Sequence, residues 1–305
     1  MSMYDLVSVG TTTIDMYFKG GSLEVKDGRF DLVCGSKYFV DSFQESIGGG
    51  ATNVAIGASK LGMRVSLVTE IGQNSFKRVI FEKLDLHAVS YKHCLLSHEF
   101  RNFSTVLLRD DGEKTVINYR TVHTDFLKQL PPDELFTKAK CLYLGHVAQV
   151  SVYHRTMLLR TARKHGLTTY VTLGSDDLQQ AHDHLADLIS HTDVLFLNRE
   201  EFAEYARIGA EHLNLKDNIM HIYRHLPLPP LLVITDGANG SYAYDGANVT
   251  HQPAIPVAKI IDSTGAGDGY CAGFIHSYYK DKHLAAALKA GAQFSAHKLS
   301  HLGAN

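Results

Sequence analysis

The chain lacks both an excess of charge and a long apolar run. Lysine and arginine total 30 against 32 aspartates and glutamates, giving a formal charge of −2 over 305 residues, which argues against a nucleic-acid partner. No apolar stretch approaches the roughly 20 residues that cross a bilayer, and the N-terminus opens on a strand pattern rather than a signal peptide. With 45% apolar and 20% charged residues, the composition is that of an ordinary globular protein. We therefore expect neither nucleic-acid nor membrane binding.

Cysteine pairs and metal-ligand patterns are also missing. The four cysteines are widely spaced without a C-x-x-C motif, which predicts reduced thiols and a cytoplasmic location. Histidine is abundant, at 18 residues, but even the tightest group, His182 and His184, has no partner pattern typical of a metal site. We interpret the histidines as solvated surface residues.

No P-loop of the form G-x-x-x-x-G-K-[ST] occurs, but a different glycine-rich turn does. From Asp262 to Phe274 the chain reads DSTGAGDGYCAGF, between a predicted strand over 258–261 and a predicted helix over about 269–279. Gly265 and Gly267 allow backbone N–H groups to approach an oxyanion, and the helix N-terminus adds partial positive charge. Asp268 would repel a bound phosphate, so it makes sense as a base that takes a proton from a substrate hydroxyl. Taken alone, the segment also fits an ordinary strand-to-helix turn.

Strand patterns alternate with amphipathic helices along most of the chain. Several of the strand patterns are apolar throughout, which is typical of parallel strands buried on both faces. The alternation predicts an α/β fold with a doubly wound, mostly parallel sheet flanked by helices. The predicted strands are 4–9, 64–69, 140–144, 168–173, 193–197 and 231–235, with helices over about 150–165 and 178–189 and a hairpin of 242–244 with 248–251.

Two segments, at about 13–47 and 93–122, interrupt this alternation. Both contain short β-like runs, and in the second the runs 102–108 and 114–119 flank Asp110-Asp111-Gly112, which is a hairpin signal. As inserts in a single domain of residues 1–305, they could form a small sheet over the edge of the main sheet where open α/β folds bind ligands. Two separate surface hairpins are the alternative.

A second glycine motif, Gly48-Gly49-Gly50, precedes a helix of small residues that ends at Gly62. Small side chains let this helix pack closely on the sheet, and Asn53 in its first turn can point an amide towards a ligand. With both glycine motifs in this order, the chain resembles the ribokinase (PfkB-type) family of carbohydrate and nucleoside kinases over nearly its whole length. The resemblance implies a ribokinase-like fold in which a small β-sheet acts as a lid.

The resemblance also implies roles for the matching positions. Asp268 would be the catalytic base, and Gly265, Ala266 and Gly267 its anion hole. The substrate would contact Asp15, Gly48, Gly49 and Asn53, with Gly48-Gly49 also acting as a hinge. Nucleotide phosphate and Mg²⁺ would lie at Asn198, Glu201, Thr235, Gly237 and Gly240, and a monovalent cation, usually K⁺, at Asp262 and Thr264. ATP and Mg²⁺ are thus the implied cofactors, and members of the family frequently form homodimers through the lid.

Alternatives to these assignments remain open. Asn198 and Glu201 also match a helix N-cap with its capping box and need no ligand. The main hypothesis is transfer of the γ-phosphoryl group of ATP to a hydroxyl of a sugar or sugar derivative. A nucleoside kinase would use the same machinery, and a regulator could bind sugar or nucleotide without catalysis. A Rossmann dehydrogenase is disfavoured because the third fingerprint glycine is missing. The region around Gln149 offers no carboxylate where ribokinases often carry a sugar-binding glutamate, which argues against ribose itself.

Overall fold

A large sheet organises the computed structural model, which describes residues 3–109, 113–121, 124–301 and 303. Its strand order is β16-β15-β14-β13-β12-β11-β1-β6. Strands β14 to β6 run parallel, and β15 and β16 add an antiparallel edge. In chain order the strands are β1 (Leu6–Val9), β6 (Val65–Val68), β11 (Cys141–Leu144), β12 (Thr168–Thr172), β13 (Val194–Asn198), β14 (Leu231–Thr235), β15 (Ser241–Tyr244) and β16 (Val249–Gln252). The mostly parallel sheet confirms the predicted fold class.

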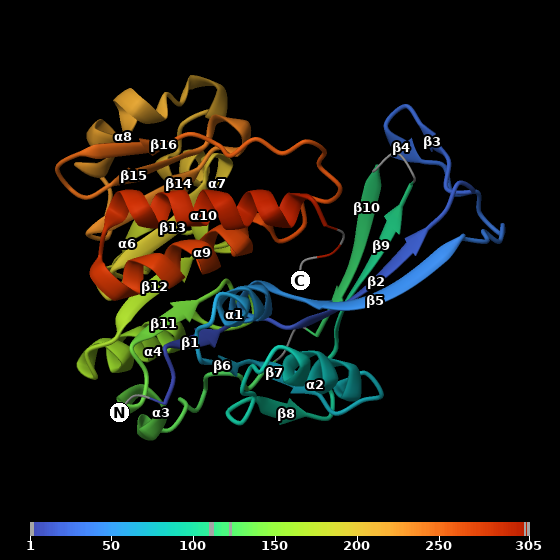
Figure 1. Cartoon of the computed structure of the whole chain (residues 1–305), viewed down its shortest axis with the longest axis horizontal. Coiled ribbons are helices and arrows are strands. Elements are labelled where there is room, and N and C mark those ends of the chain that lie inside the picture. The colour runs from blue at the N-terminus through green and yellow to red at the C-terminus, as the bar shows by residue number, and fades with distance from the viewer. Residues whose placement is uncertain (1–2, 110–112, 122–123, 302, 304–305) are drawn as a thin grey trace.

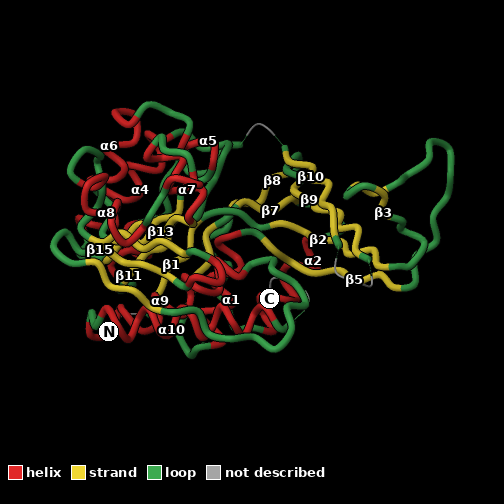
Figure 2. Tube along the Cα trace, turned by 90° about the horizontal axis from the view of Figure 1, so that it is seen from above, coloured by secondary structure: helices red, strands yellow, loops and turns green. Residues whose placement is uncertain are grey.

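Helices cover both faces of this sheet, as Figure 2 shows. Apolar side chains alternate along each strand, so successive residues of β13 enter different cores: Leu195 packs on one face and Phe196 on the other. The first core is completed by α3 (Asp133–Thr137), α4 (Val152–Lys164), α5 (Ser175–Leu178), α6 (His182–Ser190), α7 (Arg199–Ala206) and α8 (Leu215–Tyr223). The second is completed by α1 (Gly50–Lys60), α2 (Lys77–Leu86), α9 (Ala266–Asp281) and α10 (Leu284–Leu299). Within the described residues, no helix combines the length and apolar character needed to cross a bilayer.

The two inserted segments form a separate sheet with the order β10-β9-β2-β5, beside the helical layers in Figure 1. Its strands are β2 (Thr13–Lys19), β5 (Ser42–Gly48), β9 (Asn102–Leu108) and β10 (Lys114–Arg120). Strands β2 and β9 pair in parallel, so the sheet joins both segments rather than holding two independent hairpins. Phe43, Ile117 and Tyr119 remain exposed on it. Two short pairs complete the strands: β3 (Val25–Lys26) with β4 (Arg29–Phe30), and β7 (Glu70–Gly72) with β8 (Leu95–Ser97).

Most predicted elements are present, with small shifts at their ends. The predicted strand over 258–261 is wrong: the segment forms no strand and bends at Ala258 and Ile261, and Ile260 is 62% exposed. The Ile261 N–H instead donates to the carbonyl of Leu299 at the end of α10, so tertiary contact overrides β propensity there. The predicted helix over 178–189 is divided into α5 and α6. The turn Asp110-Asp111-Gly112 lies outside the described residues.

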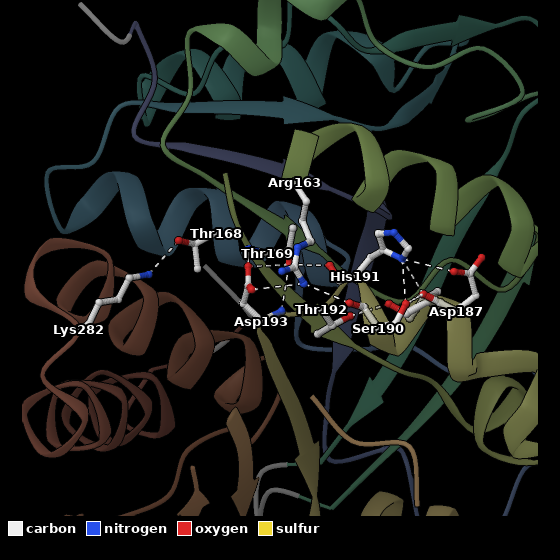
Figure 3. Close-up of polar contacts among 10 residues, drawn as sticks. Arg163, Thr168, Thr169, Asp187, Ser190, His191, Thr192, Asp193 and Lys282 are labelled. Atoms are coloured by element: carbon white, nitrogen blue, oxygen red, sulfur yellow. Dashed lines mark hydrogen bonds and ion pairs between the residues drawn. The ribbon is translucent and has the colours of Figure 1, made fainter. Parts of the chain in front are cut away.

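At the N-terminal edge of the large sheet, polar side chains bond to one another. Asp193, just before β13, accepts bonds from the Thr169 backbone N–H (2.8 Å) and hydroxyl (3.1 Å), and the Lys282 ammonium donates to the Thr168 hydroxyl at 2.8 Å (Figure 3). A second cluster joins the residues that precede three neighbouring strands, Asp5, Arg64 and Lys140. These contacts fix the starts of the strands, and the candidate site lies at the opposite edge.

Candidate active site

The glycine-rich turn forms the N-terminus of α9. Gly265 is the N-cap, with φ 73°, a left-handed conformation that glycine adopts without strain. The helix begins at Ala266, so the predicted start at Gly269 is three residues late, and Asp268 lies in the first helical turn. A Cβ placed on Gly267 would meet no atom within 4 Å, so open space lies beside the backbone here. The unpaired N–H groups of a helix N-terminus attract anions, which suits this turn to phosphate oxygens.

Asp268 and Asn53 meet where α9 and α1 begin. The Asn53 side-chain amide donates to a carboxylate oxygen of Asp268 at 2.7 Å. Burial raises the pKa of Asp268 to about 6, and the bond from Asn53 and the charge of Lys298 only partly oppose this increase. The side-chain oxygen of Asn53 is buried and has no hydrogen-bond partner among the described residues. This pair therefore combines a carboxylate of raised proton affinity with an acceptor atom left for a ligand.

Asp15, in β2, is a buried carboxylate on the small sheet. Burial is the main cause that raises its pKa, and the nearby charge of Asp262 acts in the same direction. Asp15 pairs with Ser46 of strand β5, and a Cβ on Gly48 at the end of β5 would lie 2.0 Å from a carboxylate oxygen of Asp15. Gly49 follows with φ 93°, and a Cβ there would lie 2.4 Å from the carbonyl oxygen of Thr11. Both glycines thus let β5 pass directly into α1 beside Asp15.

Asn198 and Thr235 are paired residues at the carboxyl ends of β13 and β14. Asn198 and Glu201 exchange backbone-to-side-chain bonds of 2.8 and 2.7 Å, which is the capping-box arrangement expected without any ligand. Burial raises the pKa of Glu201, and its charge contributes to the raised pKa of Asp268. Asn198 and Glu201 therefore do cap the helix, and this arrangement also holds the half-buried Glu201 carboxylate near the candidate base.

The loop after β14 carries the other predicted phosphate contacts. Gly237 begins a short 3₁₀ turn, and a Cβ on it would meet no atom within 4 Å. A Cβ on Gly240 would lie 2.1 Å from the carbonyl oxygen of Gln252, so close packing excludes any side chain there. The Arg199 guanidinium bonds to Asp236 at 3.1 Å and ties this loop to α7. The loop is thus fixed at its base and open at Gly237.

Asp262 and Thr264 are already engaged by a side chain that the sequence did not single out. The Lys114 ammonium, from β10, donates to the Asp262 carboxylate at 2.6 Å and to the Thr264 hydroxyl at 2.7 Å. The two residues to which the family resemblance assigns a monovalent cation therefore bind a protein ammonium group instead.

A small cavity lies between the C-terminal edge of the large sheet and the small sheet. Its polar side chains include Glu70, Asn102 and Gln149, and Phe100 and Phe126 contribute to its apolar wall. The Glu70 carboxylate accepts a bond from Thr124, while burial raises its pKa. Glu70 follows the predicted strand 64–69 directly, and a polar residue at that end of a parallel strand is a signal that could have identified it.

The predicted site residues form four main groups. Asp268 and Asn53 bond directly, and Asp15 lies against Gly48. Asn198 and Thr235 end two neighbouring strands, with Glu201 in the helix that follows β13, and Asp262 and Thr264 bind Lys114. In the part of the chain that the structure describes, no cluster of three or more histidine, cysteine, aspartate or glutamate side chains could hold a metal ion. Any divalent cation would therefore share its coordination with ligand oxygens.

Comparison with known proteins shows which family the chain belongs to. The model of the pfkB family carbohydrate kinases matches residues 3–305. A nucleoside kinase of Methanocaldococcus jannaschii is 26% identical over 283 residues, covering 92% of this chain and 86% of that protein. A 5-dehydro-2-deoxygluconokinase of Listeria monocytogenes is 24% identical over 306 residues, covering 94% and 87%. The structure of Arabidopsis thaliana ribokinase complexed with ribose and ATP shares the fold, with a TM-score of 0.82 at 20% identity over 99% of this chain and 94% of that one. Since the family model spans almost the entire chain, this protein belongs to the pfkB family of carbohydrate kinases.

Proposed function

We propose that the protein transfers the γ-phosphoryl group of ATP to a hydroxyl of a sugar or sugar derivative, with Asp268 as the general base. The observation that carries this proposal is the position of Asp268. It lies in the first turn of a long helix whose backbone faces open space at Gly267, with a pKa raised to about 6. Such a carboxylate is ionised at neutral pH, yet it binds a proton more readily than an exposed one.

The residues around Asp268 supply the remaining steps. The acceptor hydroxyl would donate to Asp268, which removes its proton as the oxygen attacks phosphorus. The unpartnered side-chain oxygen of Asn53 would accept a bond from a second substrate hydroxyl, and Asp15 would bind further hydroxyls. The backbone N–H groups of Gly265, Ala266 and Gly267 would stabilise charge on the transferred phosphoryl oxygens.

The nucleotide would occupy the edge between the turn at Gly267 and the loop at Gly237, where both backbones face open space. Mg²⁺ would fit beside Glu201, because Glu201 and Asp268 are half-buried carboxylates and a cation would relieve the repulsion through which Glu201 raises the pKa of Asp268. It would be held through Glu201 and Asn198 together with nucleotide oxygens and water. When bound, Mg²⁺ neutralises the charge that develops on the phosphates.

We infer a sugar-like acceptor because the Asp15 carboxylate and the unpartnered side-chain oxygen of Asn53 can each accept hydrogen bonds from substrate hydroxyls. A nucleoside is the second candidate, since its ribose offers hydroxyls of the same kind. The similar proteins named above include one kinase of each type.

A substrate panel tests this assignment. Purified protein would be incubated with ATP and Mg²⁺ against sugars, sugar acids and nucleosides, with ADP release and the mass of the phosphorylated product as readouts. We expect one acceptor class to give a product that is about 80 Da heavier than the acceptor, which is the mass added by one phosphoryl transfer. Binding of ATP and a sugar without any product would instead support a non-catalytic regulator.

The small sheet would act as a lid that excludes water during transfer, with Gly48-Gly49 as its hinge. We also propose a homodimer, because Phe43, Ile117 and Tyr119 are 56%, 60% and 61% exposed on this sheet and a second copy could cover them. Light scattering of the wild type and of Ile117→Lys would test this. Dimerisation that survives the charged substitution would place the interface elsewhere.

A further inference from the structure

Lys114 reaches from the small sheet to the segment that leads into the anion-binding turn. It is the first residue of β10, and 148 positions separate it from Asp262. Its ammonium lies 2.6 Å from the Asp262 carboxylate and 2.7 Å from the Thr264 hydroxyl. The side chain of Asp262 is only 3% exposed and that of Lys114 is 28% exposed, so the ion pair is largely shielded from water.

Every bond that Asp262 makes helps to hold this segment. The oxygen that binds Lys114 also accepts from the Thr264 N–H at 2.9 Å and hydroxyl at 2.7 Å, and the other oxygen accepts from the Gly303 N–H at 3.1 Å. Burial alone would raise the pKa of Asp262, but Lys114 and Thr264 outweigh it and keep the pKa below its ordinary value. The carboxylate is therefore ionised and already coordinated.

A second buried ammonium approaches the same region from α10. Lys298 is 7% exposed, and its ammonium lies 3.4 Å from the carbonyl oxygen of Gly303. Gly303 therefore bonds Asp262 through its N–H and Lys298 through its carbonyl. Burial lowers the pKa of Lys298 to about 8, and the charges of Asp262 and Asp268 only partly oppose this decrease, so the ammonium is still mostly protonated at neutral pH. Positive charge behind the turn is thus supplied by the protein from two directions.

We propose that the Lys114 ammonium takes the place of a bound monovalent cation behind the anion-binding turn, so that turnover requires no K⁺. This rests on the proposed kinase function. A cation at this position would have to coordinate the Asp262 and Thr264 oxygens, and Lys114 already binds both. Because Lys114 belongs to the small sheet, the same contact couples the position of that sheet to the turn that carries Asp268. Movement of the sheet away from the turn withdraws the charge that neutralises Asp262.

The test compares wild type with Lys114→Met at a constant ionic strength of about 0.1 M, with K⁺, NH₄⁺ or tetramethylammonium as the only monovalent cation. We expect wild-type kcat to be the same in all three. Lys114→Met should lose roughly tenfold or more in tetramethylammonium, as expected for an uncompensated buried charge, and recover in K⁺ or NH₄⁺. Lys114→Arg keeps the charge and should need no added cation. Lys26→Met, which removes an exposed lysine paired with Asp31 beyond the same sheet, is the matched control.

Thermal unfolding provides a readout that does not depend on catalysis. K⁺ should raise the Tm of Lys114→Met but leave that of wild type and Lys26→Met unchanged, because only the vacated site gains a ligand. This result would stand even if no acceptor were phosphorylated, so failure of the kinase assignment and failure of this proposal can be distinguished. A wild-type enzyme activated by K⁺ would overturn the proposal, as would a folded Lys114→Met that no cation restores or that matches wild type without one.

Discussion

The two edges of the large sheet use the same residue types in opposite ways. At the N-terminal edge, Asp5 accepts bonds from Arg64 at 3.0 and 3.1 Å and from Lys140 at 2.7 Å, and these partners hold its pKa well below the ordinary value. At the C-terminal edge, Asp268 has one amide partner and a pKa raised to about 6. Paired charges stabilise the fold, whereas a desolvated carboxylate with few partners retains the capacity to bind a proton.

The comparison also separates stability from chemistry. A lowered carboxylate pKa means that the folded state favours the ionised form, so ionisation of Asp5 contributes to stability. A raised pKa means that the folded state disfavours the charge, so ionised Asp268 is held at an energetic cost. Substitutions at the two edges should therefore affect different measurements.

The largest effect is expected at Asp268. Asp268→Asn removes the proton acceptor while keeping the side-chain shape, so kcat should fall by about 10²–10⁴. The free energy of unfolding should not decrease, because the variant no longer buries a charge. Steady-state kinetics and thermal unfolding would measure both. Asp281→Asn, at the other end of the same helix, is the control, and near-wild-type turnover of Asp268→Asn would exclude the assigned role.

Asp15→Ala tests the contribution of the small sheet to substrate binding. The loss of a carboxylate that binds substrate hydroxyls is worth about 1.5–3 kcal/mol, or roughly 10- to 150-fold in kcat/KM for the acceptor. The KM for ATP should change much less. Gln44→Ala, an exposed position in β5 of the same sheet, should alter neither constant. An equal rise in both KM values would point to a distorted sheet rather than a lost contact.

Asp5→Ala probes the opposite edge. The loss of hydrogen bonds between charged groups should lower the free energy of unfolding by about 1.5–3 kcal/mol. Urea titration would measure it, and Asp187→Ala, which breaks an exposed pair with Arg160, should cost less than about 1 kcal/mol. Since the pKa of Asp5 is lowered on folding, its contribution is complete above about pH 4 and declines as the pH falls further. A loss of kcat without a loss of stability in Asp5→Ala would contradict the comparison.

The smallest effect is the pH dependence of wild type. With the pKa of Asp268 at about 6 in the free protein, kcat/KM should decrease below pH 6, because the protonated carboxyl can no longer accept a proton. Asn53→Ala removes a bond that lowers this pKa, so the acidic limb should move to higher pH. The limb should stay in place in Asp5→Ala. If the acidic limb disappears in Asp15→Ala, the group that titrates is Asp15 on the small sheet rather than Asp268.

Much of the fold could be predicted from local patterns. Apolar strand patterns and amphipathic helix patterns predicted the alternation of β and α elements, and the glycines around Asp268 indicated a helix N-terminus. The segment over 258–261 was predicted wrongly as a strand because β-branched residues are also compatible with an unpaired, exposed stretch. Glu70 was missed although its position directly after a parallel strand could have identified it, and Lys114 was missed because a single lysine within a hairpin gives no distinctive local pattern.

By itself, the sequence determined most of the secondary structure and the two glycine motifs, because these follow from neighbouring residues and backbone sterics, and it indicated the carboxylate that we propose as the base. Tertiary structure alone decided which groups meet. Asn53 lies 215 positions from Asp268, and Lys114 lies 148 from Asp262. Burial raises the pKa of Asp268, because the cost of a buried charge depends on its three-dimensional surroundings. The fold of the small sheet brings Lys114 to the position where a free cation was expected.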